Sequence, residues 1–211
     1  TGIVYSGSTG FVVTKNGLSG AARFIFAGED GTISAWAPNV DLTNAVLAVD
    51  NSASHSVYKG LALAGNGQGN FLYAADFRHA RIDIIDASFH RVNWAGAFVD
   101  PKLPAGYAPF GIQNLQGNLY VTYAKQDAAA HDDMAGPGLG LVNVFDANGM
   151  LIRRVATGGR LNAPWGMALA PADFGKFSNA LLVSNFGDGR ISAFDARNGE
   201  LLGQLRGSDG R

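Results

Sequence analysis

The feature that most constrains the fold is a repeat of about 50 residues, found when the chain is aligned with itself. Each copy has a short apolar run, a turn rich in Gly, Asp or Asn, and a second strand that alternates apolar and polar residues. The equivalent anchors Ile33, Ile82, Val142 and Ile191 are separated by 49, 60 and 49 residues. The copies lie at 22–38, 71–87, 119–147 and 181–196.

Two further apolar segments accompany each copy, so that each unit offers about four short strands. Upstream segments lie at 58–64, 109–115 and 164–170, with equivalent glycines at Gly60, Gly111 and Gly166, while the first unit offers only 10–14. Downstream strands are predicted at 45–50, 94–100, 151–157 and 201–206. Four strands in about 50 residues are typical of a β-propeller blade. We therefore predict an all-β propeller with four-stranded antiparallel blades, about four in this chain, at approximately 1–50, 51–100, 101–157 and 158–211.

Composition agrees with this fold class and excludes several functions. Gly accounts for 29 of 211 residues and charged residues for only 16%, which indicates many tight turns. The net charge of −1 offers no basic field for nucleic acid or an anionic membrane. The chain has no Cys, which excludes thiolate metal sites, and no apolar run long enough to insert into a membrane.

The repeated Pro-x-Gly element, the aliphatic run and the Ile-x-x-Phe-Asp ending resemble the NHL repeat in the second to fourth units. The stretches "TGIVYSGSTGFVVT" (1–14), "FIFAGEDGTISAW" (24–36) and "LNAPWGMALAPADFG" (161–175) look more closely like a family of uncharacterised bacterial exported proteins. This resemblance implies an extracellular or cell-surface propeller of about six blades, some members carrying a C-terminal surface-sorting signal, with no assigned activity. With four units, this chain is expected to be part of a six-bladed parent, and exposed blade faces would favour self-association.

The third unit carries the candidate ligand site, because it is 11 residues longer than its neighbours. The additional residues fall in "AKQDAAAHDDMAGPGLG" (124–140), a turn between the second and third strands. In a propeller such turns project over one mouth of the central channel. The candidate ligand-binding residues in this turn are Lys125, Asp127, His131, Asp132 and Asp133; the alternative interpretation is a solvated polar loop.

Aromatic residues near the repeated glycines are candidates for the same mouth. Tyr58, Phe110 and Trp165 could stack on a sugar or an aromatic ligand, or could instead pack between blades.

A hard cation such as Ca²⁺ is a further hypothesis, because it binds to oxygen ligands on converging loops. Asp76 and Asn185 align at the end of the second strand, and Asp188 follows nearby. The residues that we align with them in the other units, Ala27 and Tyr123, supply no carboxylate. Asx turns that satisfy backbone groups are the alternative.

Two functional classes follow from these patterns. The first is a non-catalytic binding or scaffold module for a protein, a glycan or a surface polymer. The second is a Ca²⁺-dependent hydrolase or lactonase of the six-bladed type, which would need about four converging oxygen ligands. A structural subunit of a surface assembly is a further alternative.

Overall fold

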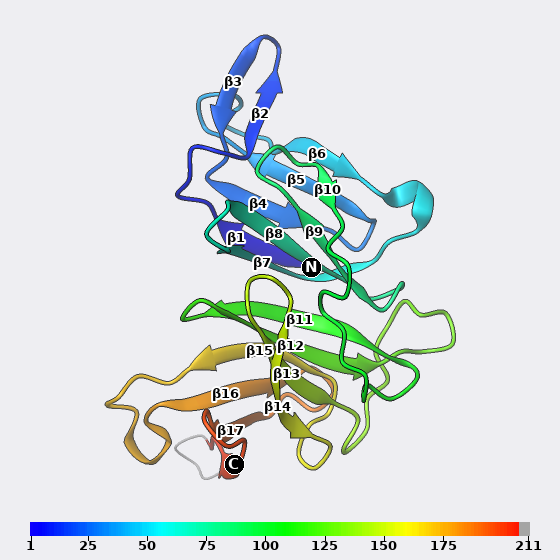
Figure 1. The fold of residues 1–211 in the computed structure, drawn as a ribbon, viewed down its shortest axis with the longest axis vertical. Helices are drawn as coiled ribbons and strands as arrows, with labels where there is room; N and C mark the ends of the chain where they lie inside the picture. The colour runs from blue at the N-terminus through cyan, green and yellow to red at the C-terminus, as the bar shows by residue number, and fades with distance from the viewer. Residues whose placement is uncertain (207–211) are drawn as a thin grey trace.

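The computed structural model describes residues 1–206, which form four four-stranded antiparallel sheets and one separate hairpin (Figure 1). The prediction of an all-β propeller with four-stranded blades is confirmed. The first sheet contains β1 (Gly2–Tyr5), β4 (Phe24–Ala27), β5 (Thr32–Trp36) and β6 (Val46–Asp50). The second contains β7 (Tyr58–Gly65), β8 (Asn70–Asp76), β9 (Arg81–Ile85) and β10 (Arg91–Val92). The third contains β11 (Tyr107–Leu115), β12 (Asn118–Lys125), β13 (Leu141–Phe145) and β14 (Leu151–Thr157). The fourth contains β15 (Pro164–Leu169), β16 (Ala180–Asn185), β17 (Ile191–Asp195) and β18 (Leu201–Gln204).

The sheets stack face to face, and their first strands lie side by side in the order β1, β7, β11, β15. Alternation along each strand sends one set of apolar side chains to each face. The first and second sheets bury a shared core that includes Ile25, Ile33 and Leu72. Equivalent cores lie between the second and third sheets and between the third and fourth. The first and fourth sheets lie at opposite ends of the molecule (Figure 1).

The repeated glycine has a direct packing role between blades. A Cβ added at Gly2 would lie 2.3 Å from the backbone N of Leu61, and one at Gly111 would lie 2.0 Å from the backbone O of Trp165. At Gly60 it would lie 3.0 Å from backbone atoms of the third sheet. Only glycine therefore lets adjacent inner strands approach this closely.

One predicted strand of the first blade is assigned wrongly. The inner strand is β1 (Gly2–Tyr5), whereas 10–14 leads into a protruding hairpin of β2 (Val12–Lys15) and β3 (Leu18–Ala21) (Figure 1). Asn16 and Gly17 join its strands, with φ of 52° and 79°. An Asn-Gly pair with positive φ at both residues is the preferred two-residue hairpin turn.

The predicted outer strand at 94–100 is also wrong. The outer strand of the second blade is the two-residue β10 (Arg91–Val92). The segment after it turns away at Gly96 and Phe98, which have φ of 78° and 56°. Trp94 packs edge-on against Phe71, at a centroid distance of 4.9 Å. Trp94, Ala97 and Phe98 thus cover the core between the second and third sheets rather than extend the sheet.

In the described part of the chain, the remaining regular structure consists of two short 3-10 turns, Ser52–Ser54 and Gly175–Phe177. Among residues 1–206 there is no helix whose length and hydropathy would suit a membrane span.

Candidate functional site

A repeated irregularity in the inner strands builds the candidate site. The register shifts between Tyr58 and Gly60, between Pro109 and Ile112, and between Pro164 and Gly166. β-Bulges of this kind change the direction of a side chain. In the third and fourth sheets the backbone N–H of the repeated glycine is satisfied by a hydroxyl of the second strand, Thr122 Oγ1 at 2.8 Å and Ser184 Oγ at 3.1 Å.

The residue before each repeated glycine lines one cavity of about 220 Å³, which we call the mouth cavity. These residues are Thr1, which directly precedes β1, and Lys59, Phe110 and Trp165 in the inner strands of the other three sheets. Turns contribute the rest of the lining: Glu29 from the β4–β5 turn, Asp132 and Asp133 from the long β12–β13 turn, and Phe186 from the β16–β17 turn. The fold therefore brings one inner-strand position of every blade to a single place.

Lys59 is the electrostatic centre of the mouth cavity. It is only 5% exposed, and its Nζ lies 3.0 Å from Glu29 Oε2 and 2.9 Å from Asp132 Oδ1. Its backbone carbonyl accepts a hydrogen bond of 2.8 Å from Trp165 Nε1. A buried ammonium needs such partners, because leaving water without compensation is costly. Lys59 thereby links the first, third and fourth blades.

The two adjacent carboxyl groups of the long turn have opposite environments. The hydrogen bond from Lys59, followed by the contact with His131, holds the pKa of Asp132 below its usual value. Burial raises the pKa of Asp133. One side of the cavity thus carries a carboxylate stabilised in its charged form beside one that resists ionisation.

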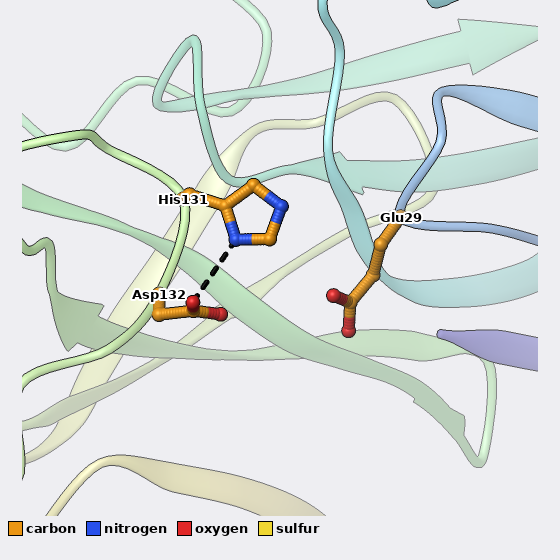
Figure 2. Close-up of side chains that lie close together, drawn as sticks. All are labelled: Glu29, His131 and Asp132. Atoms are coloured by element: carbon orange, nitrogen blue, oxygen red, sulfur yellow. Dashed lines mark ion pairs between the residues drawn. The ribbon is translucent and has the colours of Figure 1, made fainter.

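Glu29, His131 and Asp132 are a group whose potential metal-ligand atoms all lie within 4.8 Å of one another (Figure 2). His131 Nδ1 lies 3.0 Å from Asp132 Oδ2. The Lys59 ammonium bonds to both carboxylates of the group, so the positive charge that a metal ion would supply is already present. These residues therefore do not fit a divalent cation while Lys59 is in place.

The long turn is held in shape by its own polar groups. Gln126 forms an isolated β-bridge with Asp133, and its Nε2 donates a hydrogen bond of 2.6 Å to the Phe77 carbonyl. Asp127 Oδ1 accepts from the backbone N–H groups of His131 and Asp132. Of the predicted residues in this turn, the structure brings Asp132 and Asp133 to the mouth cavity and places His131 beside Asp132. Lys125 and Asp127 lie outside its lining.

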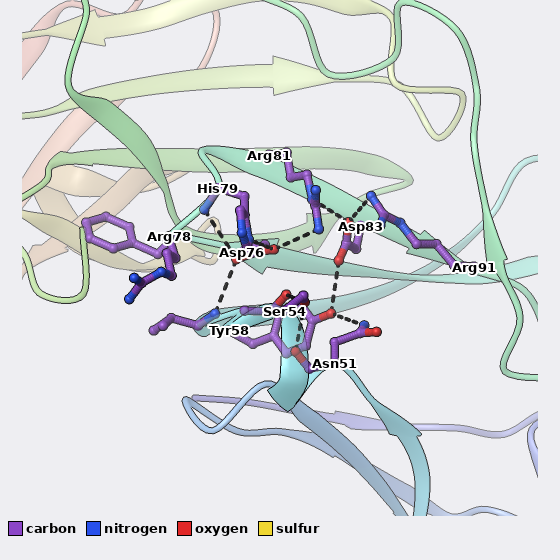
Figure 3. A network of polar contacts seen from close by, with 12 residues as sticks. Asn51, Ser54, Tyr58, Asp76, Arg78, His79, Arg81, Asp83 and Arg91 are labelled. Atoms are coloured by element: carbon purple, nitrogen blue, oxygen red, sulfur yellow. Dashed lines mark hydrogen bonds and ion pairs between the residues drawn. The ribbon is translucent and has the colours of Figure 1, made fainter. Parts of the chain in front are cut away.

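Among the predicted aromatic residues, Phe110 and Trp165 line the mouth cavity and Tyr58 does not. Tyr58 is fully buried; its hydroxyl donates to Asp83 Oδ2 at 2.9 Å and accepts from Asn51 Nδ2 at 2.7 Å (Figure 3). It is therefore unavailable for stacking on a ligand. The equivalent of Phe110 is Lys59, which the sequence interpretation missed although it directly precedes Gly60.

Asp76 belongs to the same buried network as Tyr58 (Figure 3). Its carboxylate lies 2.8 Å from His79 Nδ1 and 3.2 Å from Arg81 Nη2, and it accepts from the Val57 N–H at 3.2 Å. These partners saturate the carboxylate within the second blade and its loops.

Asn185 and Asp188 form a separate network in the fourth blade. Asn185 Oδ1 accepts from the Asn162 N–H at 3.1 Å, and its Nδ2 donates to Asp188 Oδ1 at 3.1 Å. Asp188 Oδ1 also accepts from the Arg190 N–H at 3.1 Å. The oxygens proposed as Ca²⁺ ligands thus bond to protein groups in two separate networks, Asp76 in the second blade and Asn185 with Asp188 in the fourth.

The strand register also corrects the alignment behind that hypothesis. Ala27 pairs with Ile33 as Ala75 pairs with Ile82. The first-blade equivalent of Asp76 is therefore Gly28 rather than Ala27, while Tyr123 keeps its place.

No protein-family model matches the chain. Curated relatives include three uncharacterised proteins of Acanthamoeba polyphaga mimivirus. R640 is 33% identical over 200 residues, R648 34% over 217 aligned positions and L690 35% over 215. These alignments cover 93%, 100% and 97% of this chain but only 37%, 53% and 55% of the relatives. The chain thus spans about half the length of these relatives or less.

These relatives overturn the resemblance inferred from the sequence motifs. The matching proteins are viral, so the assignment to a bacterial exported family is wrong. The extracellular location that this resemblance implied stays an untested prediction.

Solved structures support the fold. A gluconolactonase from Xanthomonas campestris aligns with a TM-score of 0.58 and 20% identity, over 87% of this chain and 57% of that one. A second, putative gluconolactonase aligns with a TM-score of 0.59 and 21% identity, over 86% of this chain and 59% of that one. At this level of identity the likeness establishes a shared propeller architecture and no shared activity.

Proposed function

We propose that this chain is a binding module whose mouth cavity takes a terminal sugar unit of a glycan. The observation that carries the proposal is the repeated bulge, which directs Lys59, Phe110 and Trp165 from three successive blades to one cavity that Thr1 and Glu29 of the first blade complete. Because residues of all four blades line this cavity, one ligand in it can contact every blade.

The lining suits a carbohydrate because it combines aromatic ring faces with carboxyl groups that can accept hydrogen bonds. The side chains of Trp165 and Phe186 are 40% and 69% exposed and offer faces for the C–H surface of a sugar ring. Glu29, Asp132 and Asp133 can accept hydrogen bonds from hydroxyl groups. The cavity is smaller than the roughly 300–1,000 Å³ typical of sites for drug-sized ligands, so we expect one sugar unit to enter.

A Ca²⁺-dependent hydrolase or lactonase is less well supported. The fold shared with a gluconolactonase and a putative gluconolactonase favours it. Lys59 opposes it, since its ammonium already neutralises Glu29 and Asp132. The engagement of Asp76 and Asn185 with protein groups opposes it as well.

A glycan array probed with the 1–211 chain tests the proposal, followed by calorimetric titration of the glycans that bind. We expect Trp165→Ala to weaken binding at least tenfold, about 1.4 kcal/mol, without a matching loss of thermal stability. Trp36→Ala removes an aromatic residue outside the mouth cavity and should leave binding unchanged.

Binding of no glycan, or equal binding by Trp165→Ala, would contradict the proposal. A Ca²⁺-dependent rise in melting temperature together with lactone hydrolysis would favour the hydrolase instead.

A further inference from the structure

Equivalent apolar positions show that, among the blades formed by residues 1–206, the first and the last each lack a neighbour on one face. Leu72, Leu119 and Leu181 occupy the same place in the second strands of the second to fourth sheets, each paired with an apolar residue of the third strand. All three are 0% exposed and lie in the core shared with the preceding sheet. Phe24 holds this place in the first sheet and is 38% exposed.

The opposite face of each sheet shows the same pattern at the other end of the chain. Ile33 and Val142 are 0% exposed, and Ile82 packs against the core shared with the following sheet. Ile191 is their equivalent in the fourth sheet and is 36% exposed. An interior residue type is thus kept at both ends, where no blade formed by residues 1–206 covers it.

The repeated glycine makes a second, independent observation at the fourth sheet. A Cβ at Gly2, Gly60 or Gly111 would meet the backbone of the following inner strand. A Cβ at Gly166 would meet only the side chain of Ser184, in its own sheet. Residue 166 is thus still a glycine, as the packing of a following inner strand would require, although residues 1–206 supply no such strand.

The exposed face of the first sheet carries a continuous aromatic row. Tyr5 and Phe24 meet edge to face with centroids 5.7 Å apart, and Phe24 lies 6.1 Å from Trp36. Ile3 and Leu47 extend the same face through the strand register and are more than half exposed. Contiguous apolar surface of this kind marks an interaction site.

We infer that both end faces are blade-to-blade interfaces, and that further blades of the same polypeptide cover them. The first face fits the side of a blade that bears residues equivalent to Ile33, and the last face fits the side that bears residues equivalent to Leu72. The length of the relatives favours additional chain over a second copy, since this chain spans 37–55% of them.

The structural neighbours indicate how many blades are needed. The alignment with the Xanthomonas gluconolactonase covers 87% of this four-bladed chain and 57% of that protein. Because blades of one propeller are of similar size, the whole neighbour corresponds to about six blades. About two further blades would therefore close the ring.

Thiol labelling tests the inference, because residues 1–211 contain no Cys. Tyr5→Cys and Ile191→Cys probe the two end faces, and Met150→Cys, 66% exposed in the β13–β14 turn, is the matched control. Each is made both in the 1–211 chain and in the polypeptide as its gene encodes it. Labelling is read by mass spectrometry at the peptide that carries the new cysteine.

In the gene-encoded polypeptide we expect the two end-face cysteines to react at least tenfold more slowly than the control. In the dilute 1–211 chain all three should react at similar rates. Equal reactivity in both chains would overturn the inference, as would an intact gene-encoded mass no greater than that of 211 residues. Protection that appears in the 1–211 chain and grows with its concentration would assign the faces to a second copy instead.

Discussion

At the residue scale, Lys59 is a buried cation whose two partners are more exposed than it is. Removing the charges of Glu29 and Asp132 leaves the buried Lys59 ammonium without a partner and out of reach of water. Removing Lys59 instead leaves two carboxylates that water can reach. We expect Glu29→Gln combined with Asp132→Asn to lower the free energy of unfolding by about 2–3 kcal/mol, and Lys59→Met to lower it by about 1 kcal/mol or less. Urea denaturation measures both. The reverse order of the two effects would contradict the role given to Lys59.

Asp132 and Asp133 are adjacent and should respond to substitution in opposite directions. The lowered pKa of Asp132 means that its contribution is present above about pH 4, the ordinary Asp pKa, and is lost as the pH falls through its folded value. The raised pKa of Asp133 means that its charged form destabilises the fold as the pH rises through its folded value. At pH 7, Asp132→Asn should lower the melting temperature and Asp133→Asn should raise it.

Both differences should shrink toward pH 3, because Asp133 is then protonated and the contribution of Asp132 is progressively lost as the pH falls toward its lowered folded pKa. Thermal scans of the two variants beside the unsubstituted chain at both pH values check this. Melting-temperature changes of the same sign in the two variants at pH 7 would contradict the opposite environments of Asp132 and Asp133.

The sequence predicted four of the residues that line the mouth cavity: Phe110, Asp132, Asp133 and Trp165. From the sequence we selected Tyr58, whereas Lys59 lines the cavity. The bulge between Tyr58 and Gly60 shifts by one residue the side chain that faces the cavity. Glu29 was missed because its turn is short and ordinary in sequence. Its importance arises only from the approach of Lys59 across two blades.

At the element scale, the inner-strand glycines offer a matched pair of substitutions. Gly111→Ala would place a Cβ 2.0 Å from the backbone O of Trp165, which cannot move without separating two blades. We expect a loss of about 3 kcal/mol or more in unfolding free energy. Gly166→Ala meets only the Ser184 side chain, with Oγ at 2.6 Å; this hydroxyl can rotate at the loss of its hydrogen bond from the Gly166 N–H, so the cost in the 1–211 chain should be about 1 kcal/mol.

Denaturation of both variants provides the comparison. Equal losses of unfolding free energy in the two variants would mean that glycine is needed for the bulge itself and not for the close approach of the adjacent blade.

Strand type and number in the repeats were predictable, because apolar runs and Gly or Asp turns recur at a fixed spacing. The exceptions have local causes. The hairpin of β2 and β3 was missed although Asn16-Gly17 signals its turn. The segment 94–100 reads as a strand, but its Trp94 packs down onto Phe71. Periodicity identifies buried residues without showing whether they extend a sheet or cover it.

At the scale of the whole molecule, the central feature is a row of four blades whose inner strands meet at one cavity. Blade architecture was predictable from the repeat, but convergence was not, because contacts such as that between Lys59 and Asp132 join residues 73 positions apart. The uncovered end faces likewise became visible only when the exposure of equivalent residues could be compared.

The measurement that most directly tests the mouth cavity as a ligand site is the set of indole N–H signals in a ¹⁵N NMR titration with a bound glycan. The chain has three Trp residues: Trp36 on the exposed face of the first sheet, Trp94 over the second blade, and Trp165 in the cavity. Because Trp165 Nε1 donates to the Lys59 carbonyl, its signal should be sensitive to a ligand beside both residues. We expect the Trp165 signal to shift with saturation while Trp36 and Trp94 stay in place. A glycan that binds and shifts Trp36 or Trp94 but leaves Trp165 unmoved would contradict the mouth cavity as the site.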